Sequence, residues 1–155
     1  MTYENENVVY APSEHIEKAV QEFETPFFLY CEERIRENCR AFKGAFDKYF
    51  KDFVPLYAVK ANPNPEVLKV IDDEGFGFDI SSEAEAWLCS KLGFSGMHTG
   101  NYTPTSELKF IKDAGFMINL DDISLLEPMK EIGVPEFLSF RINPGVGAAT
   151  NESCV

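Results

Sequence analysis

A short apolar run followed by a helical segment recurs along this chain about every twenty residues. Alternation of strands with helices produces a parallel sheet, because each helix returns the chain to the same end of the sheet. The sequence therefore predicts an α/β fold. The runs expected to form its strands are residues 54–60, 76–81, 96–100, 116–121 and 137–143, with an earlier run at 26–31.

The segments between these runs carry the start and stop signals of helices. Asn64 before Pro65 is typical of a helix start, and Gly75 is typical of a helix end. Residues 103–115 repeat that arrangement. Residues 82–85 (Ser-Glu-Ala-Glu) indicate a capping box that begins another helix.

Two further helices are predicted at residues 32–46 and 122–132. The second is expected to break or kink at Pro128, because proline lacks an N–H group and clashes with the preceding turn. The first presents one apolar stripe for packing against a sheet, made of Ile35, Cys39, Phe42 and Phe46.

The composition favours a globular protein with a small-molecule partner. Apolar residues make up 45% of the chain and aromatic residues 14%, which is enough to bury a core. The formal charge of -12 argues against a nucleic-acid partner, because phosphate binding needs a basic face. No stretch approaches the roughly 18 apolar residues of a membrane span. Residues 1–10 lack a signal-peptide pattern, so we predict a cytoplasmic protein without a membrane partner.

The four cysteines, at positions 31, 39, 89 and 154, lie far apart without a C-x-x-C pair. This spacing indicates neither a zinc site nor a disulfide framework. We interpret the cysteines as small apolar core residues.

Polar side chains follow the ends of the predicted strands. Because side chains alternate along a strand, Asp79 and Ser81 share one face while Phe78 and Ile80 take the other. An open sheet covered on both sides would be apolar on both, although its size would fit 155 residues. Polar strand ends are instead typical of a barrel mouth, so we predict a partial (β/α)8 TIM-type barrel. The alternation of side chains along the later strands likewise groups His98 with Gly100, Asn119 with Asp121, and Ser139 with Arg141 and Asn143.

Lys60 closes the first of these runs and is followed by a proline-containing loop. It shares a face with Ala58, whose small side chain leaves room for a flat ring. Burial at a strand end would favour the neutral amine, which can condense with an aldehyde. The alternative is that Lys60 extends into solvent, as most lysines do.

Residues 57–63, Tyr-Ala-Val-Lys-Ala-Asn-Pro, are similar to the Y-A-V-K-A/C-N signature of the fold-type III pyridoxal-phosphate decarboxylases. That family includes diaminopimelate, ornithine, arginine and carboxynorspermidine decarboxylases, with an alanine-racemase-like barrel. The resemblance extends from about Thr25 to Val146. It implies that pyridoxal 5'-phosphate is held covalently by Lys60, which is then both catalytic and cofactor-binding, with Ala58 beside it.

Other motifs extend the resemblance. Asp79 matches the family's aspartate near the cofactor, and Arg141, in an R-I-N-P motif, would lie beside the pyridine ring. Gly100 and Asn101 resemble the family's G-N motif at the third strand, and Asp121 resembles its fourth-strand aspartate.

These residues also have structural interpretations. Asp79 could be a buried hydrogen-bonding group and Arg141 an ion-pair partner. For Glu85 we favour the capping box over a cofactor role. For His98 we favour a satisfied polar core residue over a catalyst.

The resemblance implies a decarboxylase that converts meso-diaminopimelate to L-lysine and works as a homodimer at full length. Where the diaminopimelate branch usually has a lysine after G-N, this chain has residues 102–104, Tyr-Thr-Pro. Arginine, ornithine and carboxynorspermidine therefore remain alternative substrates. A non-catalytic cofactor carrier or degenerate homologue is a second class, and an open-sheet nucleotide domain, which would lack a phosphate loop, is a third.

The chain contains about five of the eight strands of a barrel. We expect residues 1–24 to be a leader and residues 25–155 to be the first part of the barrel domain. The phosphate anchor, the partner of the pyridine nitrogen, residues donated across the dimer and a C-terminal β domain are expected beyond Val155. The segment alone is expected to be inactive.

Overall fold

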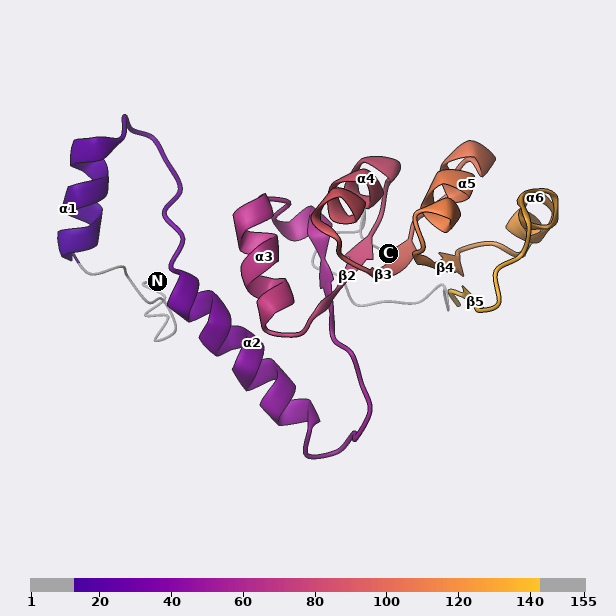
Figure 1. Ribbon diagram of the computed structural model, residues 1–155, viewed down its shortest axis with the longest axis horizontal. Helices are drawn as coiled ribbons and strands as arrows, with labels where there is room; N and C mark the ends of the chain where they lie inside the picture. The colour runs from indigo at the N-terminus through magenta and orange to yellow at the C-terminus, as the bar shows by residue number, and fades with distance from the viewer. Residues whose placement is uncertain (1–12, 143–155) are drawn as a thin grey trace, which may run out of the picture.

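The computed structural model describes residues 13–142, which contain one five-stranded parallel sheet (Figure 1). The strand order is β1-β2-β3-β4-β5. A doubly wound sheet reverses its order at a switch point, whereas a barrel adds each strand beside the previous one. The predicted partial barrel is therefore confirmed over the described strands, which are β1 Leu56–Ala58, β2 Gly77–Ile80, β3 Gly96–Thr99, β4 Met117–Leu120 and β5 Leu138–Phe140.

The predicted helices are present between the strands. Asn64 caps the first crossover helix by accepting a hydrogen bond from the Glu66 N–H at 2.9 Å, and Gly75 follows that helix with φ 77°. Positive φ carries little cost for glycine, so the chain turns there toward the next strand. The helices are α1 Ser13–Glu22, α2 Glu32–Phe46, α3 Pro65–Asp73, α4 Glu83–Leu92, α5 Thr105–Asp113 and α6 Leu126–Ile132, with 3₁₀ turns η1 Val59–Ala61 and η2 Ile123–Leu125.

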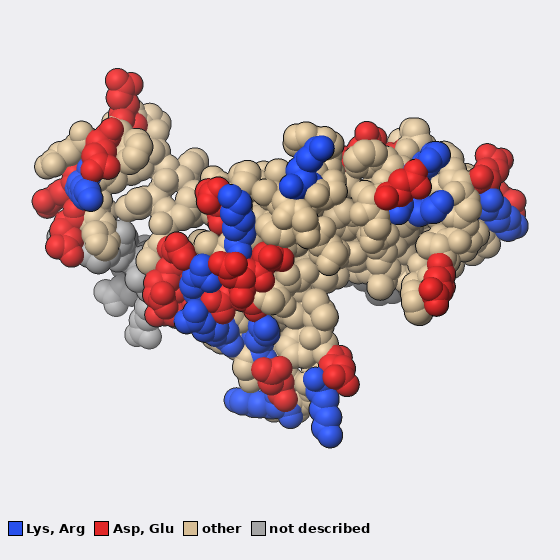
Figure 2. Space-filling model, in the orientation of Figure 1, with Lys and Arg blue, Asp and Glu red and all other residues tan. Residues whose placement is uncertain are grey.

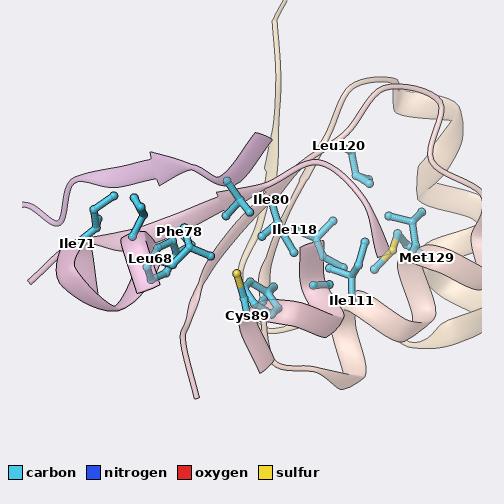
Figure 3. Packing of buried hydrophobic residues seen from close by; sticks show 14 of the residues in the cluster. Leu68, Ile71, Phe78, Ile80, Cys89, Ile111, Ile118, Leu120 and Met129 are labelled. Carbon is cyan, nitrogen blue, oxygen red and sulfur yellow. The ribbon is translucent and has the colours of Figure 1, made fainter. Parts of the chain in front are cut away.

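The helices α3 to α6 lie along one face of the sheet (Figure 1). Phe78 and Ile80 of β2 and Ile118 of β4 point to that face and are fully buried. Complete burial of such a side chain contributes about 1.5–3 kcal/mol relative to exposure. Figure 3 shows how these side chains pack against Leu68, Cys89, Ile111 and Met129 from the helices.

The opposite face of the sheet has no covering helix among residues 13–142 (Figure 1). Register places Ala58 beside Asp79, and Thr99 beside Asn119, on this face. In a closed barrel this face is the interior. The side chains that would point into the barrel are therefore half-buried or exposed here.

Ion pairs hold α2 against the end of α3, where Figure 2 shows acidic and basic side chains gathered together. Arg40 Nη2 lies 2.8 Å from Glu74 Oε1, and Arg36 Nη1 lies 3.2 Å from the same oxygen. Lys43 Nζ donates to the Glu74 carbonyl oxygen at 2.9 Å. The hydrogen bond from Arg40 lowers the pKa of Glu74, so its carboxylate stays charged.

The predicted strand at 26–31 is wrong, because these residues are irregular. None of the described strands pairs with them. Phe28 is 89% exposed. An apolar run alone does not form a strand without a neighbour to accept its backbone hydrogen bonds.

The apolar stripe of α2 is only partly buried. Cys39 is buried and Ile35 packs against the core, but Phe42 and Phe46 remain 47% and 39% exposed. The two phenylalanine rings stack on one another, with their centroids 4.7 Å apart.

The predicted break of the last helix does not lie at Pro128. The segment divides earlier, into η2 and α6, and Pro128 is the third residue of α6. Proline is tolerated in a first helical turn because the N–H groups there have no partner within the helix. The helix therefore continues to Ile132.

The predicted cap at the start of α4 is present, but the return bond from Glu85 goes to the residue before the N-cap and not to the N-cap residue itself. Ser82 Oγ accepts a hydrogen bond from the Glu85 N–H at 3.3 Å, and Glu85 Oε2 accepts one from the Ser81 N–H at 2.7 Å. These bonds link β2 to α4. Glu85 thus has the structural role that we favoured.

We expect Ser82→Ala to lower the free energy of unfolding by about 1 kcal/mol, because an orphan N–H of the first turn loses its acceptor. Urea unfolding of the complete gene product measures this change. Ser90→Ala is the matched control on the same helix, where an exposed hydroxyl donates to the Trp87 carbonyl oxygen. Equal losses in both variants would contradict the capping role.

Candidate cofactor site

Lys60 lies in η1, immediately after β1, rather than within the strand. Its side chain is exposed, and among residues 13–142 it makes no hydrogen bond or ion pair. The prediction that a strand end buries this amine is therefore wrong for the described chain. The reason is that no described segment covers that end of the sheet, so the amine faces solvent.

Asp79 lies on the neighbouring strand, directly opposite Ala58 in the register of β1 and β2. The residue is half-buried, and its Oδ1 atom is fully buried without a hydrogen-bond partner in the described part of the chain. Buried carboxylate oxygens almost always have a donor. Asp79 Oδ1 is thus not the satisfied structural group of the alternative interpretation.

Arg141 follows β5 and is tied to the motifs on the neighbouring strands. Its N–H donates to the Leu120 carbonyl oxygen at 2.7 Å, which continues the pairing of β4 with β5. Its Nη1 donates to Asn101 Oδ1 at 2.9 Å. Among residues 13–142 Arg141 has no carboxylate partner, so the structural ion pair considered from the sequence is not observed.

Two further hydrogen bonds join the carboxyl ends of β3, β4 and β5. Asp121 Oδ2 accepts from the Tyr102 N–H at 2.9 Å, and Asn119 Oδ1 accepts from Ser139 Oγ at 2.8 Å. Asp121 and Arg141 thus each bond to a residue of the turn after β3, which begins with the G-N motif. The direct contact between Asn101 and Arg141 was not predicted, although both motifs were recognised.

His98 corrects the predicted face of β3. Register pairs it with Ile80 on β2 and Ile118 on β4, so its side chain lies on the helix-covered face and is 1% exposed. Met97 and Thr99 take the open face instead. The run 96–100 has a polar residue in both alternating sets, so the sequence did not determine which set faces the barrel interior.

The cysteines of the described chain are unpaired. Burial raises the pKa of Cys89 to about 11 and also raises the pKa of Cys39, so both remain protonated thiols. Cys31 is exposed rather than a core residue, and Cys154 lies outside the described residues. Among residues 13–142 no group of three or more histidine, cysteine or acidic side chains is placed to hold a metal ion.

An apolar hollow of about 400 Å³ lies elsewhere, between α2, α3 and β1. Its lining includes Ile35, Phe42 and Tyr57 but none of Lys60, Asp79 or Arg141. The carboxyl ends of the strands therefore remain the candidate site, as expected for a parallel barrel. Their residues fit a flat aldehyde cofactor, because they combine an unpaired amine, a small neighbour, an unpartnered carboxylate oxygen and a tethered guanidinium group.

Residues 32–154 match the family described as "Pyridoxal-dependent decarboxylase, pyridoxal binding domain". The chain belongs to this decarboxylase family. The match begins at the first residue of α2 and includes all five strands. The predicted family and its pyridoxal cofactor are thereby confirmed. In the part of the chain that the structure describes, none of the helices is long and apolar enough to span a membrane.

Individual members of the pyridoxal-dependent decarboxylases agree with this assignment. Diaminopimelate decarboxylase of Methanothermobacter thermautotrophicus is 40% identical over 139 residues, which cover 86% of this chain and 32% of that protein. The structure of diaminopimelate decarboxylase from Helicobacter pylori complexed with L-lysine superposes with a TM-score of 0.79 at 25% identity, covering 89% of this chain and 36% of that one.

A lysine/ornithine decarboxylase from Vibrio vulnificus, complexed with putrescine, superposes with a TM-score of 0.67 at 26% identity. That match covers 76% of this chain and 32% of the Vibrio chain. The present chain thus spans about a third of the length of the relatives it matches.

Proposed function

We propose that this chain is the N-terminal, lysine-bearing part of a pyridoxal-phosphate-dependent decarboxylase that converts meso-diaminopimelate to L-lysine. The observation that carries the proposal is that Lys60, Asp79 and Arg141 each lie at or beside the carboxyl end of a parallel strand, β1, β2 and β5 respectively, in a chain of this family. A nucleotide-binding open sheet would not place these motifs together, because its strand order would separate them.

Each residue has a distinct role in the proposed site. The Lys60 amine, which has no partner among residues 13–142, forms the covalent link to the cofactor. Ala58 leaves space above the strand, while the half-buried Asp79 beside it contributes negative charge near the bound group. Arg141 is oriented by its bond to Asn101 and contributes positive charge beside the ring.

When bound, pyridoxal phosphate supplies an electron-withdrawing ring that accepts the electron pair released at the substrate α-carbon. In the overall reaction the bond from the α-carbon to its carboxyl carbon breaks, carbon dioxide leaves, and a proton takes its place. The protein contributes orientation and charge. The described residues leave Lys60 exposed to water. Closure of the barrel in the complete protein would exclude that water.

The substrate assignment is supported by the names of the relatives. Diaminopimelate decarboxylases of Methanothermobacter, Thermoplasma acidophilum and Archaeoglobus fulgidus are 40%, 31% and 31% identical to this chain. Residues 102–104 leave the alternative substrates open, because the diaminopimelate branch usually has a lysine there. Ornithine, arginine and carboxynorspermidine are therefore the competing substrates, and the putrescine-bound Vibrio structure supports the first of them.

The proposal is tested by measuring carbon dioxide release from the four substrates with the complete gene product and added pyridoxal phosphate. We expect kcat/KM for meso-diaminopimelate to exceed each of the other values by at least about 100-fold, because a site built for a substrate's polar groups rejects analogues that lack them. A preference for ornithine, arginine or carboxynorspermidine would select the alternative. Binding of pyridoxal phosphate without carbon dioxide release from any of the four substrates would instead indicate a carrier or a degenerate homologue.

Three further features of the complete protein belong to this proposal. Residues 1–24 form a leader and residues 25–155 the first part of the barrel domain, which is supported by a family match that begins at residue 32. The protein acts on a small amino acid as a homodimer, by analogy with the family. It works in the cytoplasm, which is supported by the free thiols of Cys31, Cys39 and Cys89.

A further inference from the structure

His98 is a buried polar residue that the proposed reaction does not use. It lies on the helix side of β3, beneath the carboxyl end of the sheet, with 1% of its surface exposed. Its Nδ1 atom has no hydrogen-bond partner in residues 13–142. A buried ring nitrogen without a partner costs stability, a cost that an apolar side chain used only for core packing would avoid.

The ring of His98 is packed against the turn that follows β3. Its Nε2 lies 3.5 Å from Thr103 Oγ1, a long hydrogen bond between two buried side chains. A Cβ atom added at Gly100 would lie 2.6 Å from the same Nε2 and would also overlap the Thr103 hydroxyl. Position 100 therefore accommodates only glycine while His98 and Thr103 keep their places.

The residues between Gly100 and Thr103 bond to residues that follow β4 and β5. Asn101 Oδ1 accepts from Arg141 Nη1 at 2.9 Å. The Tyr102 N–H donates to Asp121 Oδ2 at 2.9 Å, and Tyr102 has φ 54°, which is uncommon for a residue other than glycine. The turn is thus held by Asp121 and Arg141 on its inner side. On its outer side, its own residue Thr103 contacts His98.

We propose that His98 is a positioning residue: its neutral ring supports residues 100–103 from the helix side of the sheet, so that Asn101 meets Arg141 at the cofactor site. This inference rests on the proposed function, because it assigns Arg141 to the cofactor. His98 itself lies on the face opposite Asp79 and acts through the turn. Its effect on the cofactor should therefore disappear once Asn101 can no longer hold Arg141.

The environment of His98 favours the neutral ring. Burial lowers its pKa from the ordinary 6.5, and the carboxylates of Glu107 on α5, Asp79 on β2 and Asp121 after β4 only partly oppose this. Because the unfolded chain binds the proton more readily, the stability contribution of the neutral ring is complete above about pH 6.5. It is lost as pH falls from there through the lower folded-state pKa.

The main test measures the dissociation constant for pyridoxal phosphate in variants of the complete gene product. We expect Thr103→Val and His98→Leu each to weaken binding about three- to tenfold at pH 7.5, as when one hydrogen bond of a positioning network is lost. His98→Gln keeps an amide nitrogen near Thr103 and should restore most of the affinity. Ile111→Val, a control within the helix-side core, should lower stability without changing the dissociation constant.

A double-mutant cycle separates positioning from general damage. If His98 acts through Asn101, the variant carrying both His98→Leu and Asn101→Ala should bind no more weakly than Asn101→Ala alone. The native protein should also lose affinity relative to His98→Gln as pH falls through the folded-state pKa of His98, which burial places below 6.5. Unchanged binding in His98→Leu and Thr103→Val, or fully additive losses in the cycle, would overturn the proposal.

Hydrogen exchange at the Tyr102 amide provides a readout that does not need the cofactor. We expect faster exchange in His98→Leu, because the turn loses its outer support while the bond to Asp121 remains the inner one. If the native protein binds no pyridoxal phosphate, the proposed function fails. The exchange rate then still tests the role of His98 in the turn. If the Tyr102 amide exchanged at the same rate in His98→Leu as in the native protein, His98 would not support the turn.

Discussion

Lys60→Ala is expected to abolish covalent capture of pyridoxal phosphate and to lower kcat of the complete protein by about 10²- to 10⁴-fold, the range that follows loss of a positioned reactive group. Lys60 is the amine at the carboxyl end of β1, next to the strand that bears Asp79. Borohydride reduction followed by peptide mass spectrometry should find the cofactor on Lys60 in the native protein and at no lysine in the variant.

Lys69→Ala is the matched control for this experiment. Lys69 is an exposed lysine on α3 whose ammonium group lies 2.7 Å from Glu66 Oε1, on the helix side of the sheet. We expect native capture and native kcat in this variant. Capture of the cofactor at another lysine in the native protein, with full activity in Lys60→Ala, would contradict the assigned site.

Phe78→Ala is expected to lower the free energy of unfolding by about 3–5 kcal/mol, because it leaves a cavity in the core as well as removing buried apolar surface. The Phe78 ring is fully buried and stacks on Phe94, with centroids 4.6 Å apart. Figure 3 shows it among the side chains that hold the sheet to α3. Urea denaturation of the complete protein, followed by circular dichroism of the barrel helices, measures the change.

Phe28→Ala controls for loss of an aromatic ring without loss of core. Phe28 is 89% exposed in the irregular segment before α2, so its replacement should change stability by less than about 0.5 kcal/mol. A small effect at Phe78, or an equal effect at both positions, would show that the core is not centred on β2.

Local signals in the sequence were sufficient for most elements of the fold. The Asn64 and Pro65 start, the Ser82 cap and the glycine after each crossover helix act within one turn of backbone, so they have the same effect in any tertiary context. The five β-strands were identified from apolar runs, and the polar residues at their ends favoured a barrel, in which the strands follow one another in chain order. The run at 26–31 failed because a strand also needs a partner, which no local pattern provides.

The site was predicted less completely than the fold. Motifs identified Lys60, Asp79 and Arg141 as residues at the ends of strands, and the structure brings them to one edge of the sheet. Motifs did not give the exposure of Lys60, which depends on what covers the barrel mouth. They also did not give the bond from Arg141 to Asn101, which joins residues forty positions apart and exists only once β3 and β5 lie in the same sheet.

The order of strands and helices, the caps and the position of Lys60 after the first strand were determined by the sequence, because each depends on contacts between near neighbours along the chain. The face taken by His98 and the turn that it supports were decided only by the tertiary structure. The physical reason is register: sliding a strand by one residue exchanges its two faces. Packing of β3 between β2 and β4 determines the register that is adopted.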